Sequence, residues 1–317
     1  MITLHSEEST WGKRLDEKIV EEIIPYSLVA IDKPCGPSSH EVSAYVKKIL
    51  GVTKTGHSGT LDPEVSGVLP VLLGEATKAA GFLLRERKTY VAVMKLREPK
   101  TDAQLEDAFQ RFRGKIYQKP PKKSAVKREL RIREIYSLKL LQNAGQFVVF
   151  ESEVQAGTYI RKLCYDLGEY LGCGGLMAEL RRIVSAGINE TQTHTLQDLS
   201  DAVWLWKENG DDSELKKILV PIENAIQLKK VTVSDGAIKP ITTGANLAIP
   251  GILSLDESIQ KDEPVQILSG KGELLCFAKA LKGAEEIQSK KKGMAFDVQR
   301  VIRSHSAYPP GDAKQRF

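Results

Sequence analysis

The sequence contains few cysteines and lacks any apolar run long enough to span a membrane. Its four cysteines are Cys35, Cys164, Cys173 and Cys276, and no two of them form a C-x-x-C pair. This scatter excludes a disulfide framework and argues against a structural zinc site, so we expect reduced and mostly buried thiols. No apolar stretch approaches ~18 residues and residues 1–16 are polar, which predicts a cytoplasmic protein without a membrane segment.

Low-complexity segments and internal repeats are also missing. Hydrophobic residues make up 41% and charged residues 27% of the 317 residues, as in ordinary globular proteins. These values exclude a largely disordered chain. A chain of this length is expected to form two domains, or one large domain with a small companion.

Positive charge is unevenly distributed along the chain. The segment 113–133 has nine Lys or Arg side chains against one acid, Glu129, a net charge of +8 in a chain whose total is +5. Such a basic stripe predicts a polyanion partner, because each Lys or Arg that meets a phosphate releases counterions. The alternative is a solvated charged helix face. Pro120 and Pro121 in its middle favour an extended arm instead.

Periodicity and capping residues predict the elements of the first two thirds of the chain. Ser38 with Glu41, and Thr101 with Gln104, form capping boxes that each predict a helix, and apolar spacing predicts a third helix from residue 159. Apolar runs and alternating patterns predict strands over residues 27–31, 68–73, 88–96 and 146–154.

The last third of the chain changes character. Helices are expected from residue 196 and over residues 215–226, and short strands with Gly-containing turns are expected from residue 229. The strands are predicted over residues 231–233, 248–252, 264–269, 274–280 and 294–302. We therefore divide the chain into an N-terminal extension (1–24), a first domain (25–227), a small β-rich domain (228–305) and a disordered tail (306–317).

Asp62 is the strongest candidate for a reactive side chain. It lies in a glycine-rich stretch, residues 56–67, where Pro63 biases its backbone towards an extended conformation. The stretch is expected to be a loop that holds the carboxylate beside the buried strand 68–73. From these residues alone, an Asp that only hydrogen-bonds its own turn remains the alternative.

The segment 56–78 resembles motif II of the pseudouridine synthases. The similarity is to the branch that contains the bacterial enzyme acting on the tRNA T-loop and the RNA-guided enzymes of box H/ACA ribonucleoproteins, dyskerin among them. Other family motifs are matched in order at residues 33–39, 88–90, 157–161 and 179–182, and residues 231–303 resemble a PUA domain. The basic run 120–128 is most similar to the archaeal and eukaryotic RNA-guided members.

The resemblance implies an α+β fold: a pseudouridine synthase fold with a central mixed, mostly antiparallel sheet, plus a small β-barrel-like PUA domain. It also implies an isomerase, which breaks the C1′–N1 bond of uridine and forms a C1′–C5 bond without a cofactor or metal. One buried carboxylate suffices for this, and the resemblance assigns that role to Asp62. It assigns the stacking surface for the flipped base to Tyr90, and the partner of the Asp62 carboxylate to Arg161.

The remaining residues are expected to contact RNA. By resemblance, Leu180 forms the apolar wall of the pocket, Arg181 or Arg182 contacts the RNA backbone, and His57 shapes the loop or touches RNA. The basic stripe adds Lys122, Lys123, Lys127 and Arg128.

The expected substrate is rRNA or tRNA. An RNA-guided relative binds a guide RNA and three small proteins, namely a zinc-ribbon protein, a β-barrel protein and a kink-turn-binding protein. We therefore expect an RNA-guided uridine isomerase acting on rRNA. A standalone enzyme for the tRNA T-loop uridine, a non-catalytic RNA scaffold and a ribonucleoside hydrolase are the alternatives.

Overall fold

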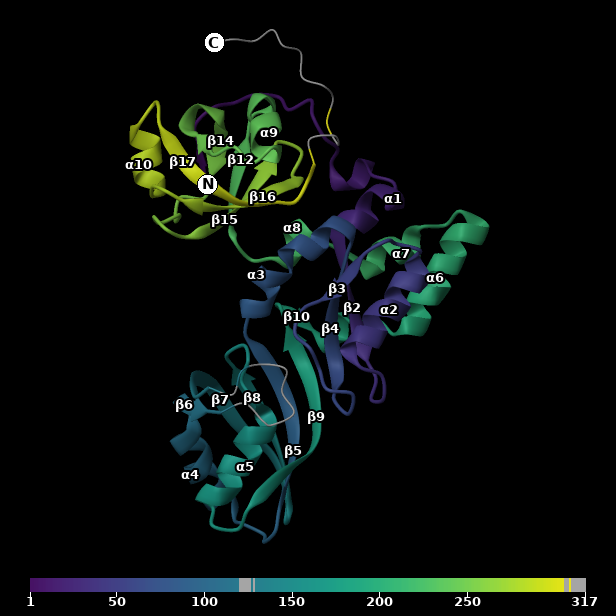
Figure 1. The fold of residues 1–317 in the computed structure, drawn as a ribbon, viewed down its shortest axis with the longest axis vertical. Coiled ribbons are helices and arrows are strands. Elements are labelled where there is room, and N and C mark those ends of the chain that lie inside the picture. The colour runs from purple at the N-terminus through teal and green to yellow at the C-terminus, as the bar shows by residue number, and fades with distance from the viewer. Residues whose placement is uncertain (120–126, 128, 305–307, 309–317) are drawn as a thin grey trace.

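The protein is an α+β molecule built on two β-sheets, as the computed structural model in Figure 1 shows. The structure describes residues 1–119, 127, 129–304 and 308. The first sheet has the strand order β11-β2-β4-β9-β5-β8-β7-β6, with β3 beside β4 and β10 beside β9. Its strands are β2 (Ser27–Lys33), β3 (Thr55–His57), β4 (Ser66–Leu73), β5 (Lys88–Leu96), β6 (Gly114–Gln118), β7 (Arg131–Ala144), β8 (Phe147–Val154), β9 (Gly175–Ser185), β10 (Ile188–Asn189) and β11 (Leu219–Pro221). The described pairings in this sheet are antiparallel except β4 with β9, which confirms the expected mixed, mostly antiparallel sheet.

Helices α2 (Ser39–Leu50) and α6 (Leu196–Asn209) cover one half of this sheet. The predicted capping box of α2 is confirmed: Ser38 Oγ accepts from the Glu41 N–H, and the Glu41 carboxylate accepts from the Ser38 N–H. The apolar side of α2, including Val42 and Val46, is buried with residues of β2, β4 and α6. This packing holds α2 against the sheet.

Helices α4 (Asp102–Phe112) and α5 (Ile160–Tyr170) cover the other half, formed by β5, β7 and β8. The Thr101–Gln104 capping box of α4 is confirmed. Phe109 of α4 lies 5.4 Å from Phe150 of β8, measured between ring centroids, in a core that also includes Leu163 of α5. The periodicity of these segments therefore predicted both their type and their buried side.

The two halves meet where β4 runs parallel to β9. Gly67 of β4 is paired with Arg182 of β9, and its φ of +104° lies in the left-handed region. A Cβ atom at Gly67 would lie 2.1 Å from the Arg182 carbonyl oxygen. Only glycine permits this approach of the two backbones.

The prediction of a single helix over residues 215–226 is wrong. The structure has α7 (Ser213–Ile218), then β11, then α8 (Ile222–Ala225). Pro221 cannot donate a backbone hydrogen bond inside a helix, and it is tolerated in β11 because that strand lies at the edge of the sheet. β11 pairs with β2 through Leu219 and Val29.

The second sheet has the order β1-β14-β12-β15-β16-β17-β13. Its strands are β1 (Ile2–Thr3), β12 (Lys229–Val233), β13 (Leu247–Ala248), β14 (Ile252–Leu255), β15 (Pro264–Ser269), β16 (Leu274–Ala280) and β17 (Met294–Val301). The strand expected over residues 248–252 is wrong, because a 3₁₀ turn at Ile249–Gly251 that contains Pro250 separates β13 from β14. Short helices α9 (Asp235–Thr242) and α10 (Ala284–Ser289) pack against this sheet.

The N-terminal segment is integrated into the second sheet. Ile2 of β1 pairs with Leu255 of β14, and Trp11 stacks on Tyr308 with 6.3 Å between the ring centroids. The chain then forms α1 (Val20–Ile23) and enters β2 of the first sheet. Tyr308 is buried, whereas the rest of the expected disordered tail, 306–317, lies outside the described residues.

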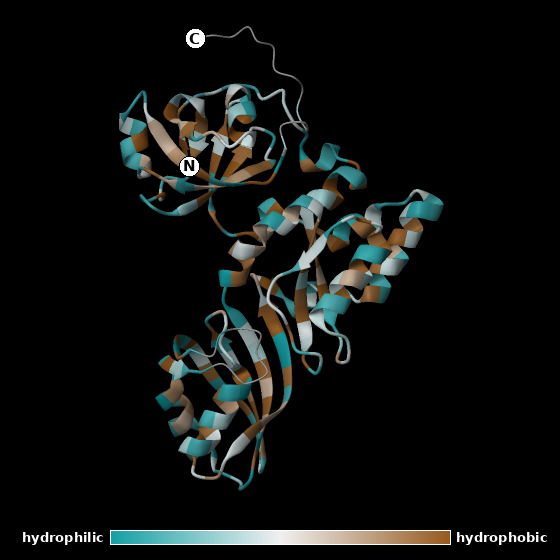
Figure 2. Cartoon of the chain, in the orientation of Figure 1, coloured by the Kyte–Doolittle hydropathy of each residue, from teal (hydrophilic) through white to brown (hydrophobic). Residues whose placement is uncertain are grey.

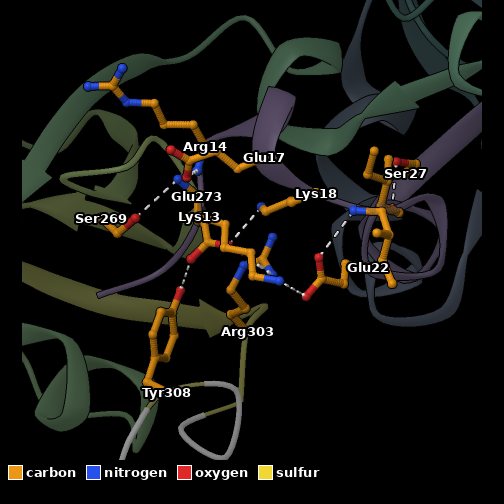
Figure 3. A network of polar contacts seen from close by, with 12 residues as sticks. Lys13, Arg14, Glu17, Lys18, Glu22, Ser27, Ser269, Glu273, Arg303 and Tyr308 are labelled. Carbon is orange, nitrogen blue, oxygen red and sulfur yellow. Dashed lines mark hydrogen bonds and ion pairs between the residues drawn. The ribbon is translucent and has the colours of Figure 1, made fainter. Parts of the chain in front are cut away.

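A buried polar cluster joins the N-terminal segment to both sheets (Figure 3). The Glu273 carboxylate lies 2.7 Å from Lys18 Nζ and 3.6 Å from the Arg303 guanidinium, and it accepts a hydrogen bond of 2.8 Å from the Tyr308 hydroxyl. The Arg303 guanidinium stacks 3.7 Å above the Tyr26 ring, which precedes β2. The cluster therefore links the two sheets through charged and aromatic groups.

Apolar residues line the strands of both sheets, whereas polar residues dominate the outer sides of the helices (Figure 2). Of the four thiols, Cys35 is exposed and the others are buried, and all are free. Within the described part of the chain, no helix is long and apolar enough to cross a membrane. The same residues include no group of three His, Cys, Asp or Glu side chains placed to hold a metal ion.

Candidate active site

Asp62 lies in the loop between β3 and β4, which we call the Asp62 loop (residues 58–65). The Val65 N–H donates to the Asp62 carbonyl at 3.0 Å, which closes a tight turn at the start of β4. The Asp62 side chain is 55% exposed. The expectation of a buried carboxylate is therefore wrong for the free protein, because the turn projects the side chain away from the core.

The segment that precedes α2 fixes this loop from one side. Lys33 is completely buried, and its ammonium donates to the carbonyls of Pro34 at 2.8 Å and Pro63 at 3.2 Å. The Gly36 N–H also donates to the Pro63 carbonyl, at 2.9 Å. Burial lowers the pKa of Lys33, and the nearby Cys35 and Asp62 oppose that shift. The first family motif thus acts as a support for the second.

Arg182 fixes the loop from the other side. Its side chain is 1% exposed, and its guanidinium donates to the Val68 carbonyl at 2.8 Å and the Gly59 carbonyl at 2.9 Å. The assignment of Arg182 to RNA contact is therefore wrong, since the side chain is enclosed and its donors join the Asp62 loop at Gly59 to β4 at Val68. β9 brings it there through the parallel pairing with Gly67.

Arg161 reaches Asp62 from the opposite half of the sheet. It lies in the first turn of α5, as expected, and its Nη2 pairs with Asp62 Oδ2. One nitrogen and one oxygen form this pair. The ion pair joins the half of the sheet that supports the Asp62 loop to the half that carries α5.

Tyr90 and Leu180 lie on the two neighbouring strands β5 and β9. Tyr90 of β5 is paired with Arg182 of β9, and Ala92 of β5 is paired with Leu180. Paired residues share a face of a sheet, so Tyr90 and Leu180 are diagonal neighbours on one face. Both are partly buried against the core formed with α4 and α5. The Tyr90 ring and the Leu180 methyl groups therefore belong to one partly buried apolar surface of the sheet.

His57 ends β3 immediately before the Asp62 loop. Its Nε2 lies 3.3 Å from Thr60 Oγ1, and burial, with the charges of His40 and Arg182, lowers its pKa. The imidazole is therefore neutral at pH 7, and it contacts the loop rather than Asp62 in the described contacts.

Arg181 points to the opposite face from Arg182. Its guanidinium contacts both Asp32 oxygens, at 2.9 and 3.1 Å, and Glu190 at 2.7 Å, and the hydrogen bond with Asp32 raises its pKa. Its side chain remains 36% exposed. It joins β9 to β2 and to the turn after β10 while keeping part of its surface in solvent.

The basic stripe is described only in part. Lys127 is exposed and forms an ion pair with Glu129. Lys122, Lys123 and Arg128 lie outside the described residues.

Two supporting groups escaped the sequence analysis. The Ser39 hydroxyl contacts Leu61, the residue before Asp62. Lys88 is buried at the start of β5, where its ammonium donates to the carbonyls of Leu83, Leu84 and Glu86, and burial lowers its pKa to about 8. The sequence did contain a signal for Lys88, because it places a charged residue at an inward-facing position of the alternating strand 88–96. No local pattern marks Ser39.

Comparison with known protein families identifies the family to which the chain belongs. The profile of the TruB family pseudouridylate synthase N-terminal domain matches residues 47–160, that of the tRNA pseudouridylate synthase B C-terminal domain matches residues 161–227, and that of the PUA domain matches residues 229–302. This chain belongs to the TruB family of pseudouridylate synthases. It is an isomerase of uridine in RNA with a PUA domain at its C-terminal side.

Full-length relatives support the same assignment. The chain is 48% identical over 307 residues to a "Probable tRNA pseudouridine synthase B" of Pyrobaculum aerophilum, which covers 96% of this chain and 92% of the relative. It is 46% identical over 309 residues to the protein of the same name from Methanosarcina barkeri, with coverage of 97% and 91%.

Solved structures show the same fold. A chain of "a Cbf5-Nop10-Gar1 Complex" superposes with a TM-score of 0.88 at 42% identity, covering 96% of this chain and 93% of that chain. A chain of an "H/ACA RNP bound to a substrate RNA containing 2'-deoxyuridine" superposes with a TM-score of 0.89 at 39% identity, with coverage of 97% and 95%. The TruB-family protein described here thus resembles solved chains along nearly its whole length.

Proposed function

We propose that this enzyme is the catalytic subunit of a box H/ACA guide ribonucleoprotein that isomerises uridines in rRNA. The supporting observation is the full-length similarity, domain for domain, to chains solved in a Cbf5–Nop10–Gar1 complex and in an H/ACA particle with substrate RNA. The Asp62–Arg161 ion pair supplies the chemistry for this role. A standalone tRNA T-loop enzyme is the second candidate, and the names of the relatives favour it.

Asp62 is the catalytic residue in this proposal. Its carboxylate attacks the nucleoside covalently, or it removes the 2′ proton to give a glycal. In both routes the C1′–N1 bond breaks, the uracil turns and the C1′–C5 bond forms, after which C5 loses a proton and N1 gains one. In the glycal route the proton taken from C2′ also returns to C2′. No atom is gained or lost overall, so the protein needs to supply no oxidant and no second nucleophile.

Arg161, Tyr90 and Leu180 prepare Asp62 and the base. Arg161 aims the exposed carboxylate through their ion pair, and a flipped base stacks on Tyr90 against the Leu180 wall. The open site fits a large substrate, because the RNA itself excludes water from the carboxylate when it binds.

The RNA path uses the basic residues and the PUA domain. We assign phosphate contacts to Arg181 and to the stripe residues Lys122, Lys123, Lys127 and Arg128, with His57 at the edge of the site. The proposed units are a catalytic domain over residues 25–227 and a PUA domain over residues 228–305, whose sheet includes β1 of the segment 1–24. The proposed partners are a guide RNA and the zinc-ribbon, β-barrel and kink-turn-binding proteins of such particles.

Tritium release from RNA labelled with [5-³H]uridine tests the proposal. The purified protein is given an rRNA target with and without an H/ACA guide and the three accessory proteins, and separately a tRNA transcript. Release that requires the guide particle supports the primary proposal, whereas guide-free release from tRNA supports the second candidate. Asp62→Asn must abolish release and retain RNA binding. Release by Asp62→Asn would remove Asp62 from the mechanism.

A further inference from the structure

Two adjacent serines at the start of α2 have different partners. Ser38 is the N-cap: its hydroxyl accepts from the Glu41 N–H at 3.2 Å and donates to the Glu41 carboxylate at 2.8 Å. Ser39 is fully buried, and its hydroxyl makes no helix-capping contact. Instead it accepts from the Leu61 N–H at 2.8 Å and donates to the Leu61 carbonyl at 2.9 Å.

The Ser39 contacts fix the backbone that immediately precedes Asp62. The Leu61 carbonyl carbon is bonded to the Asp62 nitrogen, so a hydrogen bond to its oxygen sets the plane of the Leu61–Asp62 peptide. Leu61 itself is 4% exposed, which leaves its polar backbone groups little access to water. One hydroxyl therefore satisfies both polar groups of Leu61.

The residue after Asp62 is held from the same segment of the chain. The Pro63 carbonyl accepts from Lys33 Nζ and from the Gly36 N–H. Asp62 thus has a fixed backbone on both sides, while its side chain is 55% exposed. A fixed backbone under an exposed side chain is what a reacting group needs when its substrate arrives from solvent.

We propose that Ser39 is a positioning residue of the isomerisation, which directs the Asp62 carboxylate by holding the Leu61–Asp62 peptide. The inference rests on the proposed catalytic role of Asp62. Without the hydroxyl, both Leu61 backbone groups lose their partner and the loop rearranges to regain one. A displacement of the reacting group by ~1 Å costs up to about 100-fold in rate, so we expect a 10- to 100-fold lower single-turnover rate for Ser39→Ala.

The experiment compares Ser39→Ala with Thr101→Ala at the same temperature, in the particle or on the RNA that supports wild-type activity. Thr101→Ala is the matched control, since it removes the hydroxyl that caps α4 in the other half of the sheet. Single-turnover rate and RNA affinity are measured for both variants. Backbone amide exchange at Leu61, followed by NMR on ¹⁵N-leucine-labelled protein, reports the proposed contact directly.

The expected result for Ser39→Ala is a lower rate, unchanged RNA affinity and faster exchange at Leu61, with wild-type values for Thr101→Ala. A wild-type rate for Ser39→Ala, or an equal rate loss in both variants, would overturn the proposal. If Ser39→Ala does not fold, Ser39→Cys decides by the same criteria, because a thiol occupies the place of the hydroxyl but forms only weak hydrogen bonds. Asp62→Asn distinguishes failure of the proposed catalytic role of Asp62 from failure of the proposed positioning role of Ser39. An active Asp62→Asn variant refutes the catalytic role of Asp62. An inactive Asp62→Asn variant together with a fully active Ser39 variant refutes only the role of Ser39.

Discussion

Lys18 of the N-terminal segment and Glu273 of the second sheet form an ion pair of 2.7 Å in which both side chains are more than nine-tenths buried. Arg303 and Tyr308 approach the same carboxylate (Figure 3). The pair therefore lies at the junction of three parts of the chain, where a lost partner leaves a charge without solvent.

Replacing Lys18 tests the strength of this junction. We expect Lys18→Met to lower the free energy of unfolding by about 3 kcal/mol, because it leaves the Glu273 carboxylate buried with one fewer cation. Urea unfolding followed by circular dichroism measures the change. Lys13→Met is the matched control, since the Lys13–Glu22 pair is exposed and such pairs contribute ~1 kcal/mol or less. Equal losses in the two variants would contradict the assignment.

Glu223 predicts a pH dependence at the same junction. It is 9% exposed, its Oε2 has no hydrogen-bond partner among the described residues, and burial raises its pKa. In the window above its ordinary value of about 4.5, the folded protein holds a proton that the unfolded chain has lost, so the contribution of Glu223 to stability falls as pH rises.

We expect Glu223→Gln to be as stable as wild type at pH 4 and more stable at pH 7, by about 1 kcal/mol. Urea unfolding at both pH values measures the difference between the two proteins, which cancels the titration of the other carboxylates. A variant that loses stability as pH rises from 4 to 7, relative to wild type, would show that the ionised Glu223 is stabilised in the fold.

Gly67 is expected to tolerate no side chain. Gly67→Ala adds a Cβ 2.1 Å from the Arg182 carbonyl at a positive φ, and we expect a loss of more than ~3 kcal/mol or a failure to fold. Gly145→Ala is the control, because Gly145 also has a positive φ but no atom within 4 Å of the added Cβ. Thermal unfolding should show a loss of ~1 kcal/mol for Gly145→Ala. Similar losses of stability in the two variants would mean that the positive φ alone, without the close approach to Arg182, explains the requirement for glycine at position 67.

Arg161→Lys tests the proposed aiming of Asp62. The substitution keeps the charge but loses the planar guanidinium, so we expect a single-turnover rate at least about tenfold lower, equivalent to ~1.4 kcal/mol in the barrier. Arg87→Lys is the control, because the Arg87–Glu153 pair is exposed and includes no residue of the Asp62 loop, and its rate should be that of wild type. RNA affinity is measured for both, and a loss confined to affinity would assign Arg161 to binding instead.

Sequence patterns predicted those parts of the site whose secondary structure depends on residues close together in the sequence. Alternation placed β5 and hence Tyr90, capping boxes placed α2 and α4, and the Gly- and Pro-rich sequence placed Asp62 in a loop. Each of these depends on residues within about ten positions of one another.

Contacts between segments that are distant in the sequence could not be predicted from such patterns. Arg181 and Arg182 are adjacent residues of the same type, so the sequence does not distinguish them. The pairing of β9 with β4 directs Arg182 inward to the Asp62 loop and Arg181 towards Asp32. The pairing of Ile2 with Leu255 was equally invisible, since two residues carry no periodicity. The sequence therefore indicated the residues that we propose to react, but not the residues that support them.

The place of β1 in the second sheet has a consequence for biosynthesis. A ribosome makes β1 first and makes β14, its partner, only after most of the chain has emerged. At 5–20 residues per second, the first segment waits on the order of tens of seconds for the strand that receives it. The first sheet can form during that interval, whereas the second sheet closes only after strands that lie on both sides of the first sheet in the sequence have been made.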